Sequence, residues 1–61
     1  MELRIPDEIV RAAGLSEQEL LQELALLLFQ QDRLTLGYAS RLLGMYQGDF
    51  MDLLARRGIP I

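Results

Sequence analysis

The sequence predicts a mainly α-helical fold, with a short N-terminal β-strand followed by three to four helices, the last two in a helix-turn-helix arrangement. Three observations predict it. Apolar and charged residues alternate only near the N-terminus. Apolar residues recur at helical spacing along most of the remaining chain. Serine, threonine and glycine stand where these helical segments would begin and end, as helix caps do.

The composition points away from an enzyme and towards association with other chains. The 61 residues include no cysteine and no histidine, so we expect no disulfide, no metal site and no activated hydroxyl nucleophile. We therefore expect no catalytic residue, cofactor or small-molecule substrate. A chain this short buries only about 60% of the surface it exposes when unfolded. Because 51% of its residues are hydrophobic, a second copy is expected to cover the excess, as a homodimer.

Neither a secretory signal nor a membrane span is expected. Pro6, Asp7 and Glu8 interrupt the N-terminus where a signal sequence needs an apolar run. The uncharged stretch from Leu24 to Gln31 is far shorter than the roughly 20 residues that a membrane-spanning helix requires. The sequence therefore predicts a cytoplasmic protein with no membrane partner.

Residues 1–5 alternate apolar and charged side chains, which is typical of a half-buried strand. Pro6 ends this segment and opens a short helix over residues 6–13, which Gly14 closes. A strand this short is not stable alone. It is therefore predicted to pair with its own copy in the dimer.

The third segment, residues 16–32, is predicted to be the core and dimer helix. Ser16 and Glu19 have the spacing of a capping box at its start. Leucines form one apolar stripe at helical spacing, and Leu26 and Phe29 lie off this stripe, so the C-terminal half is apolar nearly all round. Together with the N-terminal strand, this helix supplies the predicted dimer interface: Leu3, Ile5, Leu24, Leu27 and Leu28.

Residues 35–57 have the pattern of a helix-turn-helix. Thr35 can cap a first helix, Gly44 breaks it, and a second helix ends at Gly58. The motif also needs a small residue where the two helices cross and apolar residues beyond the turn. The residues at these positions and at the turn are Ser40, Gly44, Phe50 and Leu53.

The charge distribution places any nucleic-acid contact in the second half of the chain. Residues 1–33 carry three arginines and seven acids, whereas residues 34–61 carry three arginines and two acids. The candidate DNA-binding residues are Arg41, Tyr46, Gln47 and Arg56. Asp49 and Asp52 on the second helix have the wrong sign to face phosphate. An alternative places DNA on paired N-terminal strands, as in ribbon-helix-helix repressors, with Glu2 and Arg4 towards the bases.

Residues 58–61 form an apolar extended tail. Either the tail lies over the core, or it anchors a partner protein. The candidate partner-binding residues are Arg57, Ile59, Pro60 and Ile61.

The stretch from Leu34 to Met45 and the closing run from Arg57 to Ile61 resemble uncharacterised protein family 0175 of small prokaryotic proteins. Ile5-Pro6, Glu23-Leu24-Ala25 and Phe29 extend the resemblance over the whole chain. The chain departs from the family pattern at Tyr46, where a serine usually caps the second helix. The resemblance implies an antitoxin-like protein that binds a PIN-domain ribonuclease-like toxin encoded beside it and represses its own operon through operator DNA.

The sequence thus predicts a single domain that acts as an antitoxin-like regulator. Two alternatives remain open: a stand-alone DNA-binding transcriptional repressor, and a homo-oligomeric interaction module that does not bind DNA. DNA retention that falls steeply with salt would distinguish the repressor from the interaction module, and co-purification with the product of the neighbouring gene would identify the antitoxin.

Overall fold

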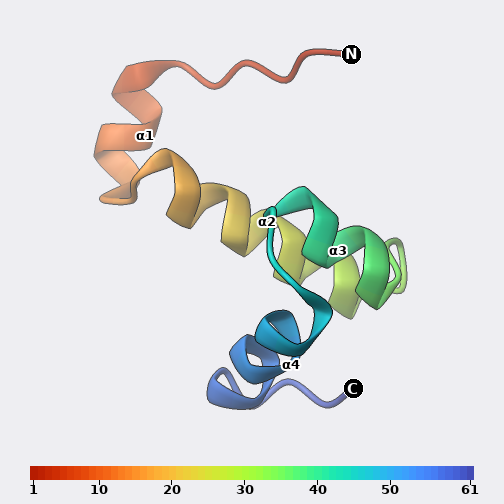
Figure 1. Ribbon diagram of the computed structural model, residues 1–61. Coiled ribbons are helices and arrows are strands. Elements are labelled where there is room, and N and C mark those ends of the chain that lie inside the picture. Colours follow the sequence, from red (N-terminus) through yellow and green to blue (C-terminus); the bar gives the residue numbers. More distant parts are fainter.

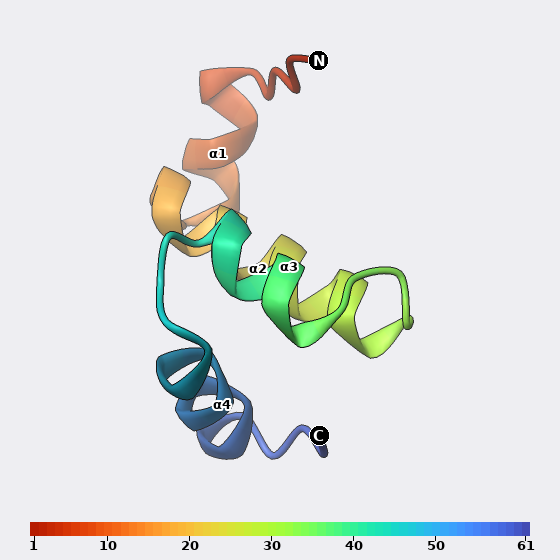
Figure 2. The same cartoon turned by 45° about the vertical axis from the view of Figure 1, so that its right-hand side comes forward.

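The computed structural model describes residues 1–61 and contains four α-helices and no β-strand. The helices are α1 (Asp7–Ala13), α2 (Glu17–Gln30), α3 (Leu36–Leu42) and α4 (Gln47–Arg56). Figure 1 shows α2 as the longest element, with α3 packed along its C-terminal half and α4 below both of them. The N-terminal arm, residues 1–6, and α1 stand apart from this packed half (Figure 2).

The predicted strand over residues 1–5 is wrong. The arm is extended, as its alternating pattern suggests, but none of the chain's backbone hydrogen bonds involves these five residues. A strand exists only as part of a ladder, and this chain has no second extended segment beside the arm. Leu3 and Ile5 remain exposed, and the arm's side-chain ion pair joins Arg4 Nη2 to Glu2 Oε2 at 3.2 Å.

Helix α1 forms through local signals alone. Pro6 precedes its first turn, which carries Asp7 and Glu8 at the positive end of the helix dipole. Gly14 ends the helix with φ at +73°, the left-handed conformation that glycine adopts without strain. None of its residues is buried, so α1 contributes little to the stability of the monomer.

Helix α2 begins with the predicted capping box. The Ser16 hydroxyl accepts a hydrogen bond from Glu19 N at 3.1 Å, and Ser16 N donates to Glu19 Oε1 at 3.0 Å. The two residues thereby satisfy two amides that the helix leaves free.

Acidification is expected to weaken this cap. The Ser16 amide and then the Ser16 hydroxyl hold the pKa of Glu19 below its usual value of 4.5. The carboxylate therefore stabilises the folded state at neutral pH, and this contribution is lost as the pH falls through the lowered pKa. An NMR titration of the Glu19 carboxyl group should show a midpoint below 4.5 that rises in Ser16→Ala. An unchanged midpoint in the variant would contradict the contribution of the hydroxyl.

The turn after α2 contains the chain's one non-glycine residue with positive φ, Asp32 at +58°. Arg33 N donates to Leu28 O at 2.9 Å and Asp32 N donates to Phe29 O at 3.1 Å, which together form a Schellman motif. Glycine is the usual residue at this left-handed position because it has no Cβ.

Asp32→Gly is therefore expected to raise the free energy of unfolding by about 0.5–1 kcal/mol, as relief of left-handed strain outweighs the added freedom of the unfolded chain. Chemical denaturation monitored by circular dichroism measures the change. Gln31→Gly is the matched control, because φ of Gln31 is −86° and glycine relieves nothing there. The control should be destabilised. A loss of stability in Asp32→Gly as well would show that the turn is not strained.

The hydrophobic core lies entirely between residues 25 and 54. Helix α2 packs against α3, and α3 packs against α4. Phe50 is fully buried at the centre, and its ring meets Phe29 edge-on with centroids 5.8 Å apart. The core comprises Ala25, Leu26, Ala39, Leu43, Phe50, Leu53 and Leu54.

The connection between α3 and α4 follows the expected spacing. Thr35 caps α3 by accepting a hydrogen bond from Tyr38 N at 3.2 Å. Gly44 ends it, with Met45 N donating to Ser40 O at 3.0 Å. Ser40 is buried and its hydroxyl donates to Gly37 O at 2.9 Å, so the small residue leaves no unsatisfied polar atom. Helix α4 lacks a side-chain cap because Tyr46 has no short oxygen to provide one.

Candidate binding surfaces

The first candidate surface is an apolar groove between the N-terminal arm and α2. It has a volume of about 570 Å³ and is lined by Leu3 and Ile5 of the arm, Val10 of α1, and leucines of α2. Glu17 and Glu23 are its two charged lining residues. Figure 1 shows the arm, α1 and α2 forming three sides of an open frame around it.

Four of the five residues predicted for a dimer interface line this groove: Leu3, Ile5, Leu24 and Leu27. Leu28, the fifth, is half-buried and lies one turn after Leu24. The opposite face of α2 carries Ala25 and Leu26, which are buried in the core. The two faces explain why the C-terminal half of this helix is apolar nearly all round: one face completes the core and the other is left uncovered.

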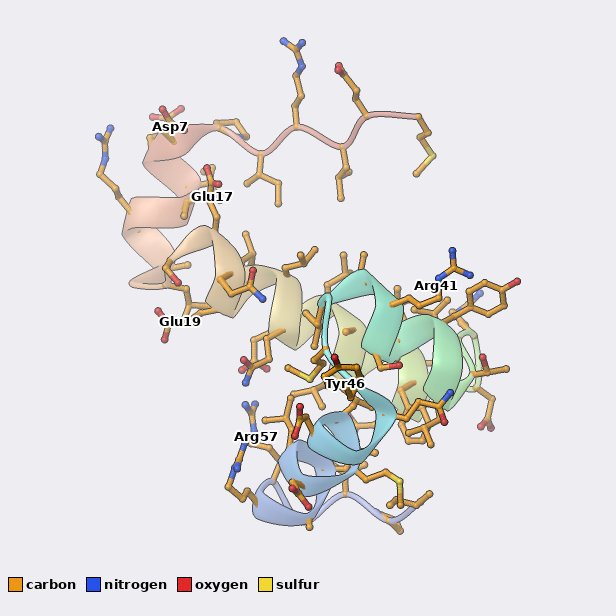
Figure 3. The ribbon with its side chains drawn as sticks, in the orientation of Figure 1. Asp7, Glu17, Glu19, Arg41, Tyr46 and Arg57 are labelled. Atoms are coloured by element: carbon orange, nitrogen blue, oxygen red, sulfur yellow. The ribbon has the colours of Figure 1, made fainter.

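The second candidate surface is a shallow hollow where α3 meets the start of α4. Its lining includes Tyr38, Arg41, Tyr46 and Gln47. The Arg41 guanidinium lies 5.7 Å from the centre of the Tyr38 ring, at cation–π distance. Tyr46 is 85% exposed and Tyr38 is 61% exposed, so two large aromatic rings that would gain free energy on burial are in contact with water. Figure 3 shows Arg41 on α3 and Tyr46 at the start of α4.

The structure brings together three of the four candidate DNA-binding residues and separates the fourth. Arg41, Tyr46 and Gln47 share the hollow, whereas Arg56 lies in the last turn of α4, about 15 Å from Tyr46 along the helix. A Cβ on Gly37 would lie only 3.3 Å from Gln47 Nε2, so the Gln47 amide rests against α3. Sequence reasoning missed the contribution of Tyr38, whose exposure depends on how α3 packs.

The C-terminal tail is held partly by the fold. Arg57 Nη2 donates to both carboxylate oxygens of Glu23, at 2.7 and 2.8 Å, and both side chains are about two-fifths exposed. Ile59 packs against the core, and its amide donates to Leu54 O at 2.9 Å. Pro60 and Ile61 are exposed. Of the four predicted partner-binding residues, the last two are therefore the ones free to bind. The Glu23–Arg57 pair spans 34 positions and has no sequence signature.

Two further features of the whole molecule bear on its chemistry. No group of three or more aspartate or glutamate residues gathers where it could hold a metal ion. None of the four helices has both the length and the apolar character needed to cross a membrane.

Comparisons with known proteins agree on one family. The family model described as "Uncharacterised protein family (UPF0175)" matches residues 1–61. A UPF0175 protein of Aeropyrum pernix is 37% identical over 59 residues, and one of Synechocystis is 34% identical over 59 residues. Each alignment covers 97% of this chain, which spans 66% of the length of either relative. No solved structure matches the chain.

Proposed function

Since the chain belongs to the uncharacterised protein family UPF0175, whose relatives carry no stated activity, we propose a function from its surface: it is a non-enzymatic, antitoxin-like regulatory protein that binds a toxin partner. The resemblance described above supports a PIN-domain ribonuclease type of toxin. One observation carries the proposal, namely the pair of exposed tyrosines with Arg41 in the hollow between α3 and α4.

Tyrosine and arginine are the side chains that most often dominate the binding energy of protein interfaces. They combine a large contact area with a polar group that needs a partner. Tyr38 and Arg41 lie one turn apart on α3, and the Arg41 guanidinium is at cation–π distance from the Tyr38 ring. Tyr46 faces the same hollow from the start of α4. These residues form a compact aromatic–arginine surface (Tyr38, Arg41 and Tyr46), suited to a protein partner.

The charges beside this surface favour a protein over DNA. Asp49 and Asp52 are both exposed on α4, in the turns that follow Tyr46. Two carboxylates on one short helix repel a phosphate backbone but can pair with basic side chains of a protein. We therefore infer a partner with basic residues around an apolar patch that receives Tyr46.

The test is co-expression of the tagged chain with the product of the gene beside its own, followed by affinity purification. A complex of the two proteins that survives washing is the expected result. Absence of a complex, with the chain itself folded by circular dichroism, would contradict the antitoxin proposal.

A second candidate function is repression through operator DNA, with α3, the turn and α4 acting as a helix-turn-helix. What favours it is that Arg41 and Gln47, two side chains suited to phosphate and base contacts, share the hollow with Tyr46. A gel-shift assay on DNA upstream of the gene tests it. Retention that falls steeply between 50 and 200 mM salt and is lost in Arg41→Ala would support repression. No retention at low salt would contradict it.

A further inference from the structure

We propose that the apolar groove is closed by the same groove of a second copy, with the two α2 helices packed antiparallel across a two-fold axis near Leu24. The proposal concerns a surface other than the aromatic–arginine surface and does not depend on the identity of any toxin. It rests on the heptad spacing of the groove-facing residues and on charge complementarity.

The uncovered face of α2 has the spacing of a helix-packing seam. Glu17, Leu24 and Gln31 are separated by seven residues each, and Leu20 and Leu27 are also seven apart. Residues at this spacing align along one side of a helix and interdigitate with a partner helix. Leu27, one turn after the centre of this seam, is 50% exposed in the isolated chain, so the apolar side is available for packing.

The ends of the seam carry complementary charges. Glu17 lies in the first turn of α2 and lines the groove. At the other end, Arg33 Nε donates to Gln31 Oε1 at 2.9 Å, which holds the guanidinium beside a residue two heptads after Glu17. In an antiparallel pair centred on Leu24, Glu17 of each copy lies opposite Gln31 and Arg33 of the other. Two symmetry-related Glu17–Arg33 contacts result, and the helix dipoles are also antiparallel.

The arm extends the apolar surface beyond α2. Leu3 and Ile5 line the groove together with leucines of α2, and both remain exposed. In the antiparallel pair they contact the second copy beside the seam, which gives the exposed arm an apolar contact without requiring a strand.

A parallel arrangement is disfavoured by the same charges. It would set Glu17 against Glu17 and Arg33 against Arg33, and like charges at both ends of the seam would repel. The first half of the chain is strongly acidic, so two copies can associate through it only in an arrangement that brings its few arginines next to carboxylates.

Sedimentation equilibrium of the whole chain at micromolar concentration tests the proposal. We expect a mass of twice the 7.0 kDa chain. Glu17→Arg and Arg33→Glu are each expected to weaken the dimer on the order of tenfold, since each creates two like-charge contacts. The combined Glu17→Arg, Arg33→Glu variant should regain most of the lost affinity, because the charges are exchanged rather than removed.

Leu24→Asp should produce a monomer, because the two-fold axis sets the two aspartates against each other in an apolar seam. Leu42→Asp is the control, since Leu42 is an exposed leucine on α3 that does not line the groove. The proposal is overturned if the unaltered chain sediments as a monomer. If the combined charge variant dimerised more weakly than either single variant, the antiparallel register would also be overturned. Glu17 and Arg33 are both exposed, so these substitutions leave the core untouched.

Discussion

Phe50→Ala is expected to remove a large share of the chain's free energy of unfolding at 25 °C. Phe50 is fully buried, and its ring touches Phe29 of α2 from its position on α4. Truncating a buried phenylalanine to alanine typically lowers the free energy of unfolding by about 3–5 kcal/mol. A domain of this size has a total of only about 3–9 kcal/mol. The core contains only seven buried residues, so this loss is large relative to the total.

Circular dichroism at 222 nm and a thermal scan measure the effect. Met51→Ala is the matched control, since Met51 is the next residue of α4 and is exposed. Its helix signal and melting temperature should change little. Cooperative melting of Phe50→Ala close to the unaltered temperature would mean that α4 is not anchored to α2 through this ring.

Tyr46→Ala is expected to weaken binding of the proposed toxin by about 30-fold or more, which corresponds to about 2 kcal/mol. Tyr46 is 85% exposed, so nearly all of its ring is available to a partner. Stability should be almost unaffected, because the side chain neither caps α4 nor belongs to the core. Isothermal titration calorimetry of the purified pair measures the affinity.

Ile9→Ala is the control for this variant. Ile9 is an exposed apolar residue on α1, in the part of the molecule that stands apart from the aromatic–arginine surface (Figure 2). Its removal should leave toxin binding unchanged. If Ile9→Ala weakened binding as much as Tyr46→Ala, the toxin would not be recognised specifically by the surface between α3 and α4.

The helix boundaries could be predicted from the sequence because they depend on local chemistry. The Ser16–Glu19 box, the Thr35 cap and the left-handed Gly14 involve residues within three or four positions of one another. The buried positions of the last two helices could also be predicted, since Ser40, Phe50 and Leu53 lie at fixed distances from the turn. These features require no knowledge of distant contacts.

The features that could not be predicted depend on partners far away in the sequence. Alternation over residues 1–5 showed an extended arm but could not provide the neighbouring strand that a ladder requires. The Glu23–Arg57 pair joins α2 to the start of the tail, and only the packed fold brings its members together. The left-handed conformation of Asp32 is a local feature, but it could not be predicted because no glycine marks that turn.

The candidate surfaces were predicted unevenly for the same reason. Periodicity identifies apolar residues on the side of α2 that faces away from the core, and the predicted interface includes four of the nine residues that line the groove. The stacking of Arg41 on Tyr38 was missed, although the two are three positions apart, because an exposed tyrosine carries no pattern that distinguishes it from a core residue. Gln47 is predicted only as a DNA-binding residue, and the position of its amide against Gly37 depends on how closely α3 and α4 approach.

The most direct test of the account is an NMR titration of the isotope-labelled chain with the unlabelled product of the neighbouring gene. We predict that amide shifts and line broadening concentrate on Tyr38, Arg41, Tyr46 and residues next to them, while α1 changes little. Changes confined to the arm and the groove, or no changes at millimolar partner, would contradict the claim that the surface between α3 and α4 binds a toxin.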